Sequence, residues 1–138
     1  MWDRNDAHQS WLETFLKNAE AIAGTVHVQR GDDLYLTAAA NIPPQVIAIV
    51  AHVPHGKGMA GLAQTKKLPV QTCNLKTDDS GTIKPGAKAV DAQAAVALPV
   101  LDENGGVRAV VGVAWMREGE ITAEQEARLW KEAEALPV

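Results

Sequence analysis

The chain has 138 residues, of which 46% are hydrophobic and 22% charged, and its formal net charge is −4. This size and balance are typical of one globular domain over residues 1–138, and they exclude a disordered or low-complexity chain. The negative charge, with no basic cluster larger than Lys66 and Lys67, argues against nucleic acid as a partner. No apolar run reaches the ~20 residues of a membrane-spanning helix, so we expect no contact with a membrane.

Cysteine usage predicts where the protein works. Cys73 is the single cysteine, so no disulfide can form within the chain. The first six residues are mostly polar, unlike an export signal, which starts basic and continues apolar. We therefore expect a protein of the reducing cytoplasm.

Hydrophobic periodicity divides the chain into helices and strands. In chain order we predict a helix over residues 7–23, strands over 25–30 and 34–40, short helices over 44–52 and 59–65, a strand over 68–73, a long loop over 76–92, strands over 94–101 and 107–115, and a helix from 122 onward. Two hairpins, flanking helices and no repeat or linker predict an α/β (α+β) fold. The expected architecture is an α/β/α sandwich around a central antiparallel sheet.

Residues that favour helix ends support this division. Asp6, followed three residues later by Gln9, is typical of an N-cap, and Gly24 can adopt the left-handed conformation that ends a helix. Thr122 and Gln125 have the spacing of a capping box at the start of the last helix.

Four stretches resemble the GAF family when their order and spacing are taken together. They are Gly56-Lys57-Gly58-Met59-Ala60-Gly61-Leu62-Ala63, Lys67-Leu68-Pro69-Val70, Ala97-Leu98-Pro99-Val100 and residues 107–113. The resemblance covers about residues 5–135 and implies a pocket between one sheet face and a cover of loops and helices. It also implies an unidentified small-molecule ligand, such as a cyclic nucleotide, tetrapyrrole, amino acid or metabolite, and a homodimer through the first and last helices. It names no cofactor.

An enzymatic alternative comes from the same resemblance. Some GAF proteins reduce free methionine-(R)-sulfoxide with cysteines that then form a disulfide. Cys73 has no partner thiol here. At the positions that match other functional residues of that subfamily the chain has unreactive side chains: Ala60 and Val90 in place of cysteines, and Ala95, Gly112 and Ala114 in place of carboxylates.

The candidate ligand contacts follow from position in the predicted elements. Tyr35 and Thr37 share a strand face and Trp115 ends a central strand, so we expect them to form cavity walls; core packing is the alternative. Asp91 precedes a central strand, where polar groups often orient ligands. Small residues on the central hairpin indicate either a roomy pocket or a closely packed helix. The candidate set is Tyr35, Thr37, Cys73, Asp91, Ala95, Ala97 and Trp115.

Two further patterns are weaker candidates. Lys57 and Gly58 open a predicted helix, whose free N–H groups favour an anion, although an exposed lysine is the simpler interpretation. Gly56-x-Gly58-x-x-Gly61 has the spacing of a dinucleotide fingerprint, but no buried strand precedes it and no βαβ unit surrounds it. A tight turn into a helix is therefore expected.

The histidines predict no metal site. His52 and His55 have an HxxH spacing, but Pro54 interrupts the helix that would bring them together, and no third ligand is evident. His27, between Val26 and Val28, points away from those valines, toward either solvent or the pocket.

The leading hypothesis is a ligand-binding or sensory module without catalysis of its own, which signals through a separate partner. One alternative is a thiol-dependent reductase of free methionine sulfoxide that uses Cys73 with an external thiol. The other is a structural dimerisation module, which would have a filled core without a cavity of roughly 300 Å³ or more.

Overall fold

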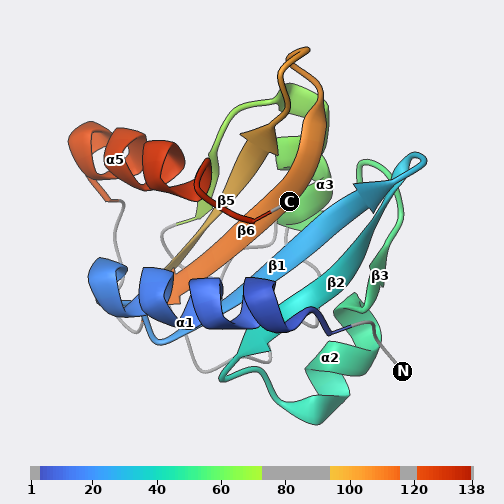
Figure 1. Ribbon diagram of the computed structural model, residues 1–138, viewed down its shortest axis with the longest axis horizontal. Coiled ribbons are helices and arrows are strands. Elements are labelled where there is room, and N and C mark those ends of the chain that lie inside the picture. The colour runs from blue at the N-terminus through green and yellow to red at the C-terminus, as the bar shows by residue number, and fades with distance from the viewer. Residues whose placement is uncertain (1–3, 73–93, 116–120, 138) are drawn as a thin grey trace.

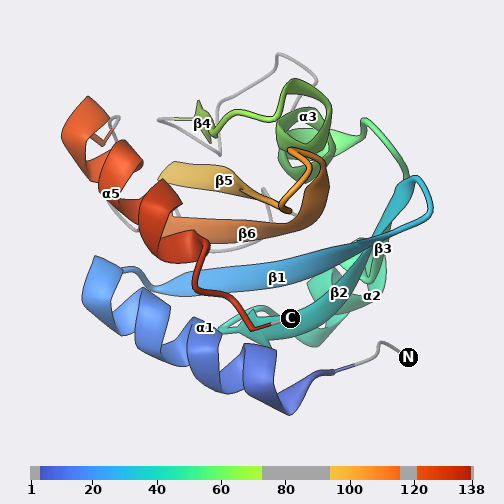
Figure 2. The same ribbon diagram turned by 45° about the horizontal axis from the view of Figure 1, so that its top comes forward.

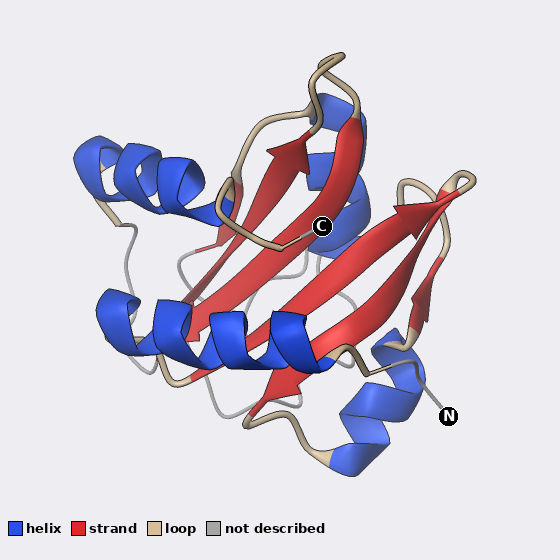
Figure 3. Cartoon of the chain, viewed as in Figure 1, coloured by secondary structure: helices blue, strands red, loops and turns tan. Residues whose placement is uncertain are grey.

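The computed structural model describes residues 4–72, 94–115 and 121–137 (Figure 1). Its elements in chain order are α1 (Asp6–Ala19), β1 (Ala23–Arg30), β2 (Asp33–Ala40), α2 (Pro44–Val50), β3 (His52–Val53), α3 (Gly58–Lys66), β4 (Val70–Thr72), β5 (Ala94–Leu101), β6 (Val107–Trp115) and α5 (Ala123–Ala133). Figure 3 shows their distribution between helix and strand. The long loop predicted over 76–92 lies outside the described residues.

The six strands form one antiparallel sheet in the order β3-β2-β1-β6-β5-β4. Both predicted hairpins are present, as β1–β2 and β5–β6. They join along β1 and β6, where His27 pairs with Val110. The centre of the sheet is thus built from strands of both hairpins.

Helices cover both faces of this sheet. Helices α1 and α5 lie on one face, and α3, with α2 near the sheet edge, lies on the other (Figure 2). The predicted α/β/α sandwich with a central antiparallel sheet is confirmed. Among the described residues, no helix combines the length and apolar character needed to cross a membrane.

The face under α1 and α5 carries the largest core. Leu12 and Phe15 of α1 and Leu129 of α5 pack there against inward-facing strand residues such as Leu98 and Val111. Cross-strand neighbours on this face are bulky, since Leu98 is the register partner of Val111 and Val96 is the partner of Val113. Large side chains opposite one another fill the space between sheet and helix.

The ends of α1 differ from the prediction, whereas the start of α5 agrees with it. The N-cap is Asn5, whose Oδ1 accepts a hydrogen bond from the His8 N–H at 3.0 Å. The helix ends at Glu20 in the left-handed conformation, and Gly24 already belongs to β1. Thr122 and Gln125 form the predicted capping box.

Candidate functional site

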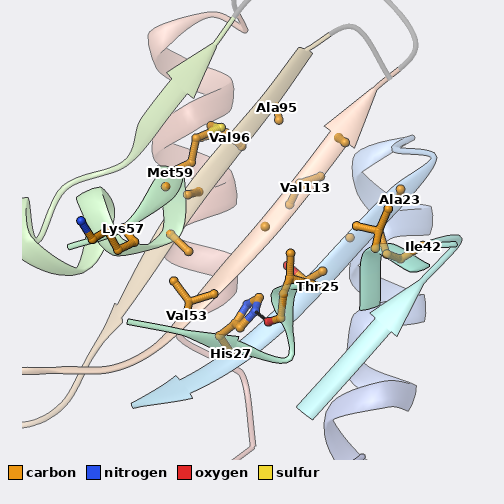
Figure 4. Close-up of a pocket in the computed structure, with 18 residues that line it drawn as sticks. Ala23, Thr25, His27, Ile42, Val53, Lys57, Met59, Ala95, Val96 and Val113 are labelled. Atoms are coloured by element: carbon orange, nitrogen blue, oxygen red, sulfur yellow. Dashed lines mark hydrogen bonds between the residues drawn. The ribbon is translucent and has the colours of Figure 1, made fainter. Parts of the chain in front are cut away.

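A cavity of about 150 Å³ lies on the sheet face opposite α1 and α5 (Figure 4). Its floor comes from β1, β5 and β6, and its cover from α2, β3 and the start of α3. The residues around it are Ala23, Gly24, Thr25, His27, Ile42, Val46, Val50, Val53, Lys57, Gly58, Met59, Ala60, Ala95, Val96, Ala97, Gly112, Val113 and Ala114.

The cavity exists because small residues meet across neighbouring strands. Ala95 is the register partner of Ala114, and Ala97 is the partner of Gly112. Thr25 of β1 pairs with the other side of Gly112. Side chains of this size occupy less of the layer beneath the helices, so space remains where the opposite face has leucine and valine.

His27 is the buried polar residue of the cavity wall. Its side chain is 3% exposed, and Nε2 lies 2.8 Å from the carbonyl oxygen of Val50. Because a carbonyl can only accept, Nε2 carries the proton and donates it. Burial lowers the pKa of the imidazole from its ordinary value of 6.5 to about 4, and the Val50 hydrogen bond opposes this only in part. The ring is therefore neutral at pH 7.

The neutral tautomer leaves Nδ1 as an acceptor. Within the described part of the chain, Nδ1 is buried and has no hydrogen-bond partner. Among the described residues, Gln64 Oε1 is the other buried side-chain atom without a hydrogen-bond partner, but Gln64 does not line the cavity. His27 is thus the buried polar side chain of a mostly apolar wall, and Figure 4 shows its ring between Val53 and Thr25.

The turn into α3 forms the rim of the cavity. Gly56 and Gly58 have positive φ values of 77° and 65°, which glycine adopts without strain. A Cβ on Gly61 would lie 2.6 Å from the Gly56 carbonyl carbon, so a side chain there would force the turn open. The glycine pattern is therefore a tight turn into a helix, and the strand before it, β3, has only two residues.

Several predicted site residues lie together around this cavity. Ala95, Ala97, Lys57 and Gly58 all line it. The same is true of three positions at which the resemblance places reductase residues, namely Ala60, Gly112 and Ala114. Cys73, Val90 and Asp91 lie outside the described residues.

The remaining predicted wall residues do not line the cavity. Thr37 lies beneath α1, with Oγ1 2.8 Å from His8 Nδ1. Trp115 belongs to the core under α1 and α5, and its indole N–H donates to the Ala19 carbonyl at 3.1 Å. Tyr35 stacks on His52 with ring centroids 4.9 Å apart. Strand alternation identified a shared face for Tyr35 and Thr37, but that face is the one away from the cavity.

The sequence did not decide whether His27 faces solvent or the pocket. In the structure His27 lines the pocket. The feature that could have identified it is alternation along β1, where Ala23, Thr25 and His27 share a face. A register shift between Val26 and His27 breaks the simple pairing with β2. Alternation on β1 alone therefore could not predict which residue of β2 lies opposite His27.

His52 and His55 make protein contacts at the rim of β2. His52 Nε2 lies 2.7 Å from Asp33 Oδ2, and His55 Nδ1 lies 3.1 Å from the Asp32 carbonyl. The hydrogen bond from His52 is the main reason that the pKa of Asp33 is lowered. In the described ranges, no group of three or more His, Cys, Asp or Glu residues is placed to hold a metal.

No family model and no curated protein matches the chain, but solved structures do. A type II free methionine-R-sulfoxide reductase from Thermoplasma acidophilum is 17% identical, with a TM-score of 0.74 over 91% of this chain and 83% of that one. The GAF domain of an Acinetobacter phosphoenolpyruvate-protein phosphotransferase is 13% identical, with a TM-score of 0.73 over 94% and 81%. A GAF domain/HD domain protein from Geobacter sulfurreducens is 10% identical, with a TM-score of 0.74 over 94% and 86%.

These similarities define the class of fold. The chain has an α/β/α sandwich whose antiparallel sheet carries a cavity on one face. This is the GAF-like fold, which GAF domains and free methionine-R-sulfoxide reductases share. The predicted resemblance is confirmed at the level of structure.

Proposed function

We propose that this chain is a small-molecule-binding, sensory domain that uses the cavity between β1, β5, β6 and α2–α3 and has no catalytic activity of its own. The observation that carries this proposal is the cavity itself, which small residues on three adjacent strands leave open beneath the helices. At about 150 Å³ the cavity is below the roughly 300 Å³ expected of a drug-sized site, so its volume agrees with the structural module as well, although a cavity of this size can hold a molecule such as benzene.

The side chains around the cavity favour binding over chemistry. Among the described lining residues there is no cysteine, aspartate or glutamate, and Lys57 carries the one full charge. Figure 4 shows the Lys57 nitrogen at the end of its side chain, at the edge of the drawn cluster. Catalysis by a nucleophile or a general acid needs an activated side chain beside the substrate. The reactive groups among the described lining residues are the neutral His27, the Thr25 hydroxyl and the Lys57 amine, and none of them has a charged side chain beside it that would activate it.

Filling the cavity tests the proposal directly. The thermal unfolding midpoint is measured against a panel of small apolar molecules, amino acids, cyclic nucleotides, haem and free methionine sulfoxide. A ligand of the folded state at 100 times its Kd stabilises the protein by about 2.7 kcal/mol. We expect a positive shift in the wild type that Ala95→Leu abolishes, because the larger side chain occupies the space.

Ala40→Leu is the matched control. Ala40 is also half-buried on a strand, but it packs on the α1 face and does not line the cavity. We expect Ala40→Leu to keep the ligand-induced shift. A panel without any shift would contradict ligand binding and favour the structural module, and a shift that survives Ala95→Leu would place the ligand elsewhere.

The reductase alternative makes a different prediction. If Cys73 works with an external thiol, the purified protein reduces free methionine sulfoxide in dithiothreitol, and Cys73→Ser abolishes that turnover. We expect no turnover in either protein. Turnover that depends on Cys73 would overturn the proposal in favour of the enzyme.

We also propose a homodimer through α1 and α5, in the cytoplasm. The exposed residues of α1 include Ser10, Glu13 and Lys17, and those of α5 include Arg128 and Glu132. A dimer built from these faces would depend on polar and charged contacts, which salt weakens. Analytical ultracentrifugation is expected to give a dimer at low salt that Lys17→Glu dissociates, and a monomer throughout would contradict it.

A further inference from the structure

We infer that the cavity takes small, neutral, apolar molecules of about the size of benzene, and that the side chain of Met59 sets this size limit. The inference rests on the proposed function and narrows its ligand to one chemical class. Its basis is the volume of the cavity, the hydrogen bonds that the groups around it already make, and the position of Met59 in its cover.

The volume of the cavity limits the size of its ligand. At about 150 Å³ it has half of the roughly 300 Å³ at which drug-sized sites begin. An apolar cavity of ~150 Å³ in another protein stays dry and binds benzene. Cyclic nucleotides and tetrapyrroles are much larger than benzene, so the walls as they stand exclude them.

The backbone of the cavity floor is already hydrogen-bonded within the sheet. Residues 95–97 of β5 pair with β4 on one side and with β6 on the other. Residues 112–114 of β6 pair in the same way with β5 and β1. The side chains at these positions that line the cavity are small and apolar. A polar ligand would therefore lose its hydrogen bonds to water on this floor without replacing them.

The two polar side chains on β1 give a charged ligand no partner. His27 is neutral, its Nε2–H donates to the Val50 carbonyl at 2.8 Å, and its Nδ1 is buried beyond the reach of a ligand. Thr25 contributes one uncharged hydroxyl. The Lys57 ammonium and the first turn of α3 lie at the rim, as Figure 4 shows for Lys57. Burying a charge on the floor would thus cost far more than burying an apolar group.

Met59 lies between the two apolar clusters of this face. It packs against the cluster of Ala23 and Val46, and also against the cluster that contains Val53 and Ala97. Of the apolar side chains in the cover that line the cavity, that of Met59 is the longest. Methionine is unbranched and fills irregular gaps. Its length therefore determines how much of the space between the two clusters stays open.

The test measures the affinity of three probes, benzene, naphthalene and benzoate, by NMR titration of the ¹⁵N-labelled protein. In the wild type we expect benzene to bind and naphthalene not to bind, because the second ring exceeds the space. Benzoate adds one carboxylate to the same ring. It should bind on the order of a hundred-fold more weakly than benzene, because the cavity floor leaves its charge unpaired.

Three variants identify the residues responsible. Met59→Ala should admit naphthalene, whereas Met59→Leu keeps an apolar side chain of similar volume and should still exclude it. Thr25→Val is the control for polarity and should bind benzene at least as tightly as the wild type does. If Met59→Ala does not fold, nuclear Overhauser effects between benzene and the Met59 methyl group in the wild type decide the role of Met59, and their absence would overturn it.

The remaining outcomes separate this inference from the proposed function. Naphthalene binding to the wild type, or its exclusion from folded Met59→Ala, would overturn the size limit. Benzoate binding as tightly as benzene, or a loss of benzene binding in Thr25→Val, would overturn the apolar class. Binding of a polar panel molecule that Ala95→Leu abolishes, without binding of benzene, would overturn the inference and leave the proposed function. Binding of no probe and no panel molecule would overturn both.

Discussion

The two faces of the sheet share the same strands but differ in what those strands present. Toward α1 and α5, neighbouring strands pair leucine and valine with valine, and the side chains fill the layer. Toward α2 and α3, the same strands pair alanine with alanine or glycine, and a cavity remains. One face therefore carries the larger core, and the other keeps a cavity beside its smaller clusters of buried residues.

The largest test of this contrast is a truncation on the filled face. Leu98 is fully buried among the α1–α5 core residues. We expect Leu98→Ala to lower the free energy of unfolding by about 3 kcal/mol, because it loses burial and leaves a new void. Urea denaturation measures this, with Met59→Ala at the cavity as the comparison. An equal loss in both variants would contradict the division of roles.

A second test enlarges a glycine on each face. A Cβ on Gly24 would lie 2.7 Å from Leu16 Cδ2 and 2.8 Å from the Gly112 carbonyl oxygen, whereas a Cβ on Gly112 would meet Thr25 Oγ1 at 2.7 Å. Backbone and packed leucine cannot move away, but the Thr25 side chain adjoins open space. We expect Gly24→Ala to cost about 2–3 kcal/mol and Gly112→Ala clearly less. Urea unfolding of both variants checks the order, and the reverse order would contradict it.

The third test uses the titration of His27. The folded-state pKa of about 4 lies below the ordinary 6.5, so the unfolded chain takes up a proton first as the pH falls. The contribution of the neutral His27 to the free energy of unfolding is therefore complete above about pH 6.5. It is lost as the pH falls toward 4, by about 2 kcal/mol between pH 7 and pH 5. The lowered pKa of Asp33 acts only below its ordinary value of 3.8, outside this range.

The pH dependence is measured as the difference between wild type and His27→Phe in urea unfolding at each pH. Subtraction removes the contribution of the other histidines, which both proteins share. A difference that does not change between pH 7 and pH 5 would show that His27 is not buried as described.

Hydrophobic periodicity predicted most of the elements but not the use of the two faces. Strand β3, His52–Val53, was missed, because the helix predicted over 44–52 ends at Val50. The strands at 94–101 and 107–115 were predicted with their observed bounds, because long alternating runs next to a glycine-rich turn leave few alternatives. The end of α1 was wrong, because Glu20 adopts the left-handed conformation and the Ile22 N–H already donates to the Ala114 carbonyl of β6. That contact is tertiary and leaves no local pattern.

The predicted site residues were also partly right and partly wrong. Ala95 and Ala97 were selected because small residues interrupt a strand, and they do line the cavity. Tyr35, Thr37 and Trp115 were selected for their size or shared face, but α1 covers the face of Thr37 and Trp115. Alternation assigns residues to faces without saying which face is covered tightly. That information depends on helix packing, which a single sequence does not contain.

The pairing of β1 with β6 determines how this chain must fold. The N-terminal hairpin gains its second neighbour only when β6 arrives from the far end of the sequence, and His8 of α1 also donates through Nε2 to the Pro137 carbonyl at 2.8 Å. Contacts between distant parts of a chain close late and slow the folding reaction. The N-terminal half alone would expose β1 as an unpaired edge, which can pair with another chain, so fragments of this protein should aggregate where the complete chain folds.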